Sequence, residues 1–151
     1  MNITSKFFRI ALIGATLVGI SLTARAAETP VSLSGVTVVS AERAKSLADS
    51  GATLVDTRAA NEYAEQHVKG ARSVPYREKS VKAADFDAAH DSFDLAKLPS
   101  DKAAPVVFYC NAGECWKSYK ASVVAQRAGY KTIYWLRGGI PEWKSKGLPV
   151  E

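Results

Sequence analysis

The fold is decided by the stretch Pro105-Val106-Val107-Phe108-Tyr109-Cys110-Asn111-Ala112-Gly113-Glu114-Cys115-Trp116-Lys117-Ser118. Residues 105–109 are apolar throughout, which is typical of a β-strand that is covered on both faces. A polar loop follows this strand, and Ser118 can cap a helix. Cys110 therefore lies at the carboxyl end of a buried strand, which is where ligands bind in open α/β sheets.

Strand and helix patterns alternate on both sides of this stretch. Strands are predicted at 36–39, 53–55, 73–75, 105–109 and 131–136. Helices are predicted at 41–48, 59–66 and 141–146, and from the cap at Ser118 to the residue before Gly129. The segment 77–104 is polar, contains one weak helix near 83–89 and is expected at the surface. This alternation indicates an α/β fold, in which a parallel β-sheet is flanked by helices on both faces.

The first 26 residues have the features of an export signal. Lys6 and Arg9 precede an uncharged apolar run at 10–23, which closes on Ala24-Arg25-Ala26, a pattern that signal peptidase accepts. As a helix this run would cover roughly 21 Å, which is short of the ~30 Å that a membrane anchor must cross. We therefore predict a signal peptide at 1–26, an N-terminal lead at 27–35, one domain at 36–151, and a periplasmic or secreted location.

Charge and composition exclude several classes of function. Of the 151 residues, 47% are apolar and 23% are charged, as in a globular domain. Without residues 1–26 the chain has 17 Lys and Arg against 15 Asp and Glu, and its lysines are scattered, so neither nucleic acid nor a membrane is expected as a partner. His67 and His90 are not spaced as ligands with the two cysteines, so no metal is expected.

Two interpretations of Cys110 follow from its position. Amide N–H groups of the loop and of the next helix can converge on its sulfur, and with Lys117 they favour the nucleophilic thiolate. Alternatively, Cys110 is a small buried hydrophobic residue at the end of a strand, as many free cysteines are. Position alone favours neither interpretation.

Four boxes occur in order around Cys110, and together they resemble the rhodanese (sulfurtransferase) family. They are Leu54-Val55-Asp56-Thr57-Arg58 with Glu62-Tyr63; His67-Val68-Lys69-Gly70-Ala71; Val107-Phe108-Tyr109-Cys110; and Gly138-Gly139-Ile140 with Trp143 and Gly147-Leu148-Pro149-Val150. The resemblance extends from about residue 36 to residue 151. It implies an α/β sheet sandwich in which Cys110 carries sulfane sulfur as a persulfide, without a metal or an organic cofactor.

The active-site loop departs from the pattern of the family it resembles. That pattern is Cys-x-x-Gly-x-Arg-Ser, and Gly113 matches it, but Cys115 stands where the arginine is expected. The basic and serine residues come two positions later, as Lys117-Ser118, so this is an atypical Cys-Trp loop. A longer loop admits a larger donor, and a lysine lacks the bidentate grip of arginine on an oxyanion such as thiosulfate.

The candidate site consists of Cys110 as the catalytic residue and the loop that follows it. The loop residues are Asn111, Ala112, Gly113, Glu114, Cys115, Trp116, Lys117 and Ser118. Cys115 is either a resolving thiol that closes a disulfide with Cys110 or a loop residue that never meets it. Lys117 is either an electrostatic stabiliser of the sulfur or a solvated lysine, and Trp116 either lines the pocket, anchors a partner or packs the loop.

Four residues outside the loop are expected to have structural roles. For Asp56 and Arg58 we expect a salt bridge or a capping role rather than chemistry. His67 follows a short helix and is expected to form structural hydrogen bonds. Arg137 either faces the mouth of the loop from the next strand end or is a surface charge.

Three functional hypotheses follow. The first is an exported sulfurtransferase, which moves sulfur from a donor such as thiosulfate to a thiol or cyanide-like acceptor, or to a protein acceptor or reductant. The second is a thiol-disulfide redox protein or persulfide carrier that uses both Cys110 and Cys115. The third is a catalytically idle binding module. Phosphatase chemistry ranks last, because residues 111–118 contain no arginine to hold a phosphate.

Overall fold

The structure, a computed structural model, describes residues 27–151, and the signal peptide predicted at 1–26 lies outside them. The elements of regular structure are β1 (Thr37–Val38), α1 (Ala41–Asp49), β2 (Thr53–Asp56), α2 (Ala60–Glu65), β3 (Arg72–Ser73), β4 (Val106–Tyr109), α3 (Trp116–Arg127), β5 (Ile133–Leu136) and α4 (Gly139–Ser145), with 3-10 turns at Ala88–His90 and Leu95–Lys97. The predicted alternation of strands and helices is confirmed. Within residues 27–151, no helix is both long and apolar enough to cross a membrane.

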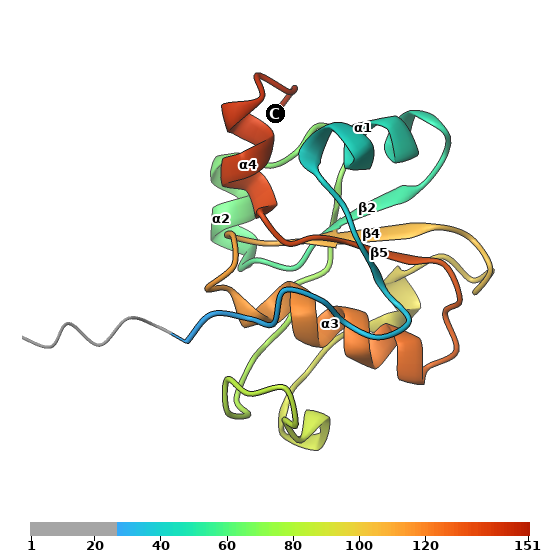
Figure 1. Cartoon of the computed structure of the whole chain (residues 1–151), viewed down its shortest axis with the longest axis vertical. Helices are drawn as coiled ribbons and strands as arrows, with labels where there is room; N and C mark the ends of the chain where they lie inside the picture. The colour runs from blue at the N-terminus through green and yellow to red at the C-terminus, as the bar shows by residue number, and fades with distance from the viewer. Residues whose placement is uncertain (1–26) are drawn as a thin grey trace, which may run out of the picture.

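The strands form one parallel sheet in the order β1-β5-β4-β2-β3, with β4 at its centre. Val107 and Tyr109 of β4 pack in the core that includes α1 and α4, whereas Val106 and Phe108 pack in the core that includes α3. Figure 1 shows the same division, with α1 and α4 on one side of the sheet and α3 on the other. Because both faces are covered, every residue of β4 is buried, as its apolar sequence predicts.

Two helices illustrate how sequence sets an element's ends. The Ser40 side chain accepts a hydrogen bond from the Arg43 N–H and begins α1, as expected of an N-cap. Gly129, with φ of +94°, follows the end of α3. The prediction that Ser118 caps α3 is wrong, because Cys115 is the N-cap. Helix α3 therefore begins three residues earlier than predicted, and the Ser118 side chain, in its first turn, is buried.

The segment 77–104 is only partly the surface segment that its polarity predicts. Phe86 and Leu98 are buried, and the weak helix expected near 83–89 is reduced to the 3-10 turn at Ala88–His90. Phe86 packs in one core cluster with Tyr119 and Val123 of α3. Widely spaced apolar residues thus attach an otherwise polar segment to the helix that follows the cysteine loop.

Candidate active site

Cys110 directly follows β4, and the backbone of α4 fixes its position. The Ile140 N–H donates to the Cys110 carbonyl oxygen at 3.0 Å. Gly139 has φ of +60°, and a Cβ atom there would collide with the Cys110 carbonyl and the Ala112 nitrogen. The glycine pair of the last sequence box therefore lets α4 begin against the start of the loop.

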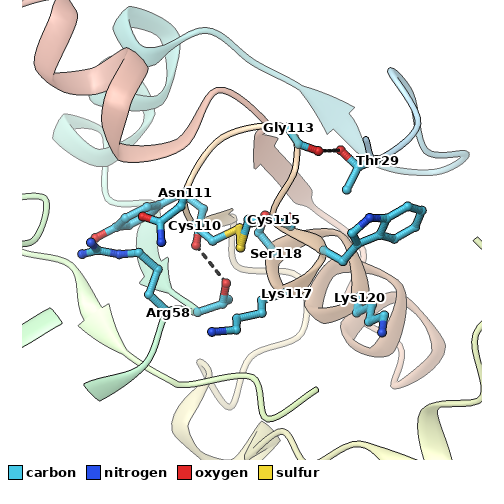
Figure 2. Close-up of a disulfide and its surroundings, with 12 residues drawn as sticks. Thr29, Arg58, Cys110, Asn111, Gly113, Cys115, Lys117, Ser118 and Lys120 are labelled. Carbon is cyan, nitrogen blue, oxygen red and sulfur yellow. Dashed lines mark hydrogen bonds between the residues drawn. A yellow bond between two sulfur atoms is a disulfide. The ribbon is translucent and has the colours of Figure 1, made fainter. Parts of the chain in front are cut away.

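The two cysteines of the chain form a disulfide with a Cα–Cα separation of 6.3 Å (Figure 2). This arrangement excludes the alternative in which Cys115 never meets Cys110. The loop between the two cysteines curves back far enough to bring their sulfurs together. It does so because Ala112 adopts a left-handed φ of 63° and the Cys115 N–H donates to the Ala112 carbonyl at 3.1 Å. Cys110 is 1% exposed, whereas Cys115 is partly exposed.

The Ser118 hydroxyl is the polar side-chain group next to the Cys110 sulfur, with its Oγ 3.1 Å from Sγ. The Trp135 indole N–H donates to the same Oγ at 2.9 Å. Since that oxygen accepts the indole proton, the hydrogen of the Ser118 hydroxyl is free to point at the sulfur. All three side chains are buried, so this hydrogen bond forms away from competing water.

The N-terminal lead holds the outer side of the loop. The Thr29 N–H and the Thr29 hydroxyl both donate to the Gly113 carbonyl at 2.8 Å. Figure 2 draws Thr29 beside Gly113 with one of these contacts. The Trp116 indole donates to the Ala27 carbonyl at 2.8 Å, and Arg137 donates to the Thr29 carbonyl at 2.8 Å. Arg137 thus faces the loop instead of being a free surface charge, and Trp116 is buried and also lines the pocket beside Cys115. The sequence carries no signal for these contacts, because the lead lies more than 80 residues from the loop.

A pocket of about 340 Å³ opens beside Cys115, and Cys110 does not line it. It is lined by Glu78, Lys82, Asn111, Glu114, Cys115, Trp116 and Lys117. The Lys117 Nζ lies 4.0 Å from Glu62 Oε2, and the Asn111 amide donates to Glu62 Oε1. Lys117 is therefore a paired charge at the mouth of the site, and Glu62 offsets part of its attraction for anions.

Glu62, which the sequence places only in the first of the four boxes, is a residue of the site. Burial acts to raise the pKa of its carboxyl, but hydrogen bonds from the Ala59 N–H and from Asn111, together with the Lys117 charge, outweigh burial and lower that pKa. Glu62 therefore stays negatively charged at neutral pH. Glu62 lies three residues after Ala59, the N-cap of α2, and its side chain accepts a hydrogen bond from the Ala59 N–H. A glutamate at this position of a helix is the sequence signal that could have indicated its place.

A buried charge network lies under the carboxyl ends of β2 and β4. We call Asp56, Arg58 and Tyr109 the Asp56 network. The Arg58 Nη2 atom lies 2.6 Å from Asp56 Oδ2, and the Tyr109 hydroxyl donates to the same oxygen at 2.8 Å. The predicted Asp56–Arg58 salt bridge is confirmed. Burial and the Asp56 charge raise the pKa of Tyr109, so its hydroxyl remains a donor.

His67 has the structural role expected of it. Its Nδ1 lies 2.9 Å from the Tyr63 carbonyl, and its ring stacks on the Tyr63 ring at 3.7 Å. Its Nε2 lies 3.5 Å from a Glu151 carboxylate oxygen. These contacts hold Glu151 against the segment after α2.

A second buried network, which the sequence analysis missed, surrounds Lys120 of α3. We call Lys120, Glu78, Ser80 and Asp91 the Lys120 network. The Lys120 side chain is fully buried, with its Nζ 2.8 Å from Glu78 Oε2, 2.8 Å from Ser80 Oγ and 3.8 Å from Asp91 Oδ2. A lysine in the middle of a predicted helix would ordinarily face water, so the pattern gave no signal.

The Asp91 carboxyl is the most strongly held acid of this network. Burial acts to raise its pKa, but hydrogen bonds from the hydroxyl and N–H of Ser80, the Lys79 N–H and the Tyr76 hydroxyl outweigh burial and lower the pKa to about 2. Asp91 thereby fixes the 76–80 segment. Glu78 of that segment lines the pocket beside Cys115.

Among residues 27–151, no three His, Cys, Asp or Glu side chains are grouped so that they could hold a metal ion. A buried sulfur beside a hydroxyl and the start of a 12-residue helix suits covalent catalysis by a thiolate.

Comparisons with known proteins agree with this architecture. The sequence matches the Rhodanese-like domain family over residues 40–146. It is 34% identical over 104 residues to the thiosulfate sulfurtransferase GlpE of Pseudomonas fluorescens, and the match covers 69% of this chain and 81% of that protein. It is 32% identical to the HTH-type transcriptional regulator Rv0324 of Mycobacterium tuberculosis over 66% of this chain, which spans only 37% of that regulator.

Among solved structures, the rhodanese-like domain from Anabaena sp. has a similar fold. Its TM-score is 0.57 at 24% identity, and the match covers 79% of this chain and 80% of that one. At this identity the likeness concerns the fold, whereas the sequence matches establish the family. The chain belongs to the rhodanese-like domain family.

Proposed function

We propose that this chain is an exported sulfurtransferase, in which Cys110 takes sulfane sulfur from a donor and passes it to a thiophilic acceptor. The observation that carries the proposal is the Cys110 sulfur, which lies between the central strand and the start of α3, 3.1 Å from the Ser118 hydroxyl. The match to a thiosulfate sulfurtransferase over 81% of that protein's length supports it.

In the first half-reaction the Cys110 thiolate attacks the outer sulfur of the donor. With thiosulfate, the donor's S–S bond breaks, sulfite leaves with the bonding electron pair, and Cys110 holds a persulfide. In the second half-reaction a thiolate or cyanide attacks the terminal sulfur of that persulfide and restores the Cys110 thiolate. The Ser118 hydroxyl stabilises the negative sulfur before and after each transfer.

The mouth of the site favours a donor other than thiosulfate. Lys117 is the cation nearest to Cys115 in sequence, and it is paired with Glu62. A doubly charged anion would have to compete with that carboxylate and would meet both Glu114 and Lys82 at the pocket. An organic persulfide or a protein-bound persulfide carries less charge and suits the mixed rim better.

The disulfide favours a second candidate function, a thiol-disulfide redox protein or persulfide carrier that uses Cys110 and Cys115 together. The two functions differ in what they turn over. A sulfurtransferase produces thiocyanate from cyanide catalytically, whereas a carrier transfers one sulfur to a partner protein and turns over poorly with small acceptors.

The test is the intact mass and turnover of the reduced protein and of its single-cysteine variants. Thiosulfate or an organic persulfide should add one sulfur atom to the reduced wild-type protein. Cys110→Ser should abolish this gain and all turnover, since a hydroxyl forms no persulfide, while the circular dichroism spectrum stays unchanged. Cys115→Ser should retain the gain and lose any dependence on reductant. Transfer by Cys110→Ser at the wild-type rate would refute the proposal.

Export is tested separately from chemistry. N-terminal sequencing of the protein recovered from its native cell should begin at Ala27, the residue after the predicted cleavage site. A retained Met1 in a membrane fraction would contradict both the predicted signal peptide and the oxidising surroundings assumed for the cysteines.

A further inference from the structure

The two sulfurs of the disulfide differ in access. Cys110 is 1% exposed, and the Ser118 side chain and the backbone at Gly139 and Ile140 lie against it. Cys115 is partly exposed and lines the 340 Å³ pocket, which Cys110 does not. Of the two cysteines, Cys115 is therefore the one more open to a thiolate from solution, and access decides which sulfur of a disulfide is attacked.

We propose that an external dithiol activates the protein by attacking Cys115, so that Cys110 is released as the thiolate. This proposal rests on the function proposed above, because it concerns how the catalytic sulfur of that function becomes available. In this activation Cys115 forms the covalent bond to the reductant, whereas in sulfur transfer Cys110 forms the bond to the donor.

The step is a thiol-disulfide exchange with two stages. The reductant's first thiolate forms a bond to Cys115 Sγ, the Cys110–Cys115 bond breaks, and Cys110 leaves with the electron pair. The reductant's second thiolate then attacks its own first sulfur, which releases the Cys115 thiolate and leaves the reductant as an internal disulfide. Two electrons pass from the dithiol to the protein, and the thiolates exchange protons with water.

The surroundings of Cys110 suit it to be the leaving group. The Ser118 hydroxyl is oriented toward its sulfur because Trp135 occupies the hydroxyl oxygen as donor. A hydrogen bond to the departing thiolate stabilises it, and a more stable leaving thiolate accelerates exchange. Reduction thus leaves the nucleophile already seated in the position where the persulfide forms.

Geometry also indicates why the reductant is a dithiol. In the mixed disulfide the Cys110 thiolate remains next to Cys115, since their Cα atoms are only 6.3 Å apart. It therefore attacks Cys115 again and expels a monothiol at a high effective concentration. A second thiol on the reductant acts intramolecularly as well, and can compete with this reversal.

The experiment maps the mixed disulfide on the oxidised wild-type protein. Glutathione in large excess serves as the probe, because a monothiol has no second thiol with which to resolve the mixed disulfide, and the excess opposes its expulsion by Cys110. After short pulses the reaction is quenched with acid and free thiols are blocked with a maleimide. A glutamate-specific protease then cleaves after Glu114, which separates the two cysteines, and mass spectrometry counts glutathione on each peptide. We expect at least tenfold more glutathione on Cys115 than on Cys110.

The matched control is the same oxidised protein pulsed in denaturant. There both sulfurs are open to attack, so the bias should fall to within about threefold. Glutathione mainly on Cys110 in the folded protein, or an equal division in both states, would overturn the inference.

Sulfur transfer by the fully reduced protein is assayed in parallel. Transfer with glutathione on Cys110 would refute only this inference. Glutathione on Cys115 without any sulfur transfer by the reduced protein would refute only the proposed function.

Discussion

Two buried charge networks flank the cysteine loop, and they are built in different ways. The Asp56 network joins residues two positions apart in one sequence box and adds the Tyr109 hydroxyl from the neighbouring strand. The Lys120 network joins one helix to residues 29 to 42 positions earlier in an irregular segment. The first fixes the strand ends under Cys110, and the second holds Glu78 at the pocket beside Cys115.

Similar burial therefore serves two purposes in this molecule. In the Asp56 network the carboxylate, the guanidinium and the hydroxyl satisfy one another inside a rigid sheet, so the network is part of the framework. In the Lys120 network a single ammonium group attaches a segment with little regular structure to α3. We therefore expect damage to the first network to cost more of the free energy of unfolding than damage to the second, which in addition changes the mouth of the site.

The largest effect is expected from Asp56→Ala. Arg58 would keep a buried charge without its partner, and breaking a buried pair in this way costs about 3–5 kcal/mol of the free energy of unfolding. Urea denaturation of the wild-type and variant proteins measures the loss. The control is Asp49→Ala, which removes an exposed pair with Lys45 and should cost less than about 0.5 kcal/mol. Equal losses in the two variants would show that the Asp56 network is not framework.

The next prediction concerns the pH dependence of the stability that Asp91 of the Lys120 network contributes. The pKa of Asp91 is about 2 in the folded protein, below the ~3.9 of an unfolded aspartate. Its contribution, about 2 kcal/mol, is fully present above about pH 5 and is lost as the pH falls from 4 toward 2.

Asp91→Asn should remove this part of the acid sensitivity. Urea denaturation of both proteins at pH 7, 4 and 2.5 measures it, and the difference in stability between them should shrink with acidity. A difference independent of pH would mean that Asp91 does not act through its charge.

A smaller effect concerns Ser118, which lies on the same helix as Lys120. Ser118→Ala leaves the buried Trp135 N–H without an acceptor and should cost about 1–2 kcal/mol of stability. It also removes the hydrogen bond to the Cys110 sulfur. Alkylation of Cys110 in the reduced protein, measured on its own peptide, should therefore slow roughly tenfold, which is the size of effect expected from losing one charge-assisted hydrogen bond. Ser122→Ala is the control, because its hydroxyl donates only to a helix carbonyl. Unchanged alkylation in Ser118→Ala would exclude Ser118 as a positioning residue.

The smallest effect concerns the contact between Thr29 of the N-terminal lead and the Gly113 carbonyl of the loop, which belongs to neither network. Thr29→Val removes one of two hydrogen bonds to the Gly113 carbonyl and should cost about 1 kcal/mol, because the Thr29 N–H still donates. Hydrogen exchange of the loop amides should rise while that of β4 amides stays the same. Equal protection of the loop in both proteins would show that the lead does not hold it.

Local sequence determined the order of the elements, the parallel sheet and the place of Cys110 at the end of its central strand. These features depend on patterns within a few residues: the apolar run at 105–109, the cap at Ser40 and the glycine after α3. The Asp56–Arg58 pair was predictable for the same reason, since both residues lie in one box.

The closure and anchoring of the loop depend on contacts between elements that lie far apart in the sequence. A spacing of five residues permits a disulfide, but the chain reversal at Ala112 and the carbonyl contact at Gly139 bring the sulfurs together. The inward side chain of Ser118, the burial of Lys120 and the docking of Thr29 each join segments far apart in the sequence. Such contacts depend on how the elements pack around the sheet, and local patterns of polarity and spacing do not encode that packing.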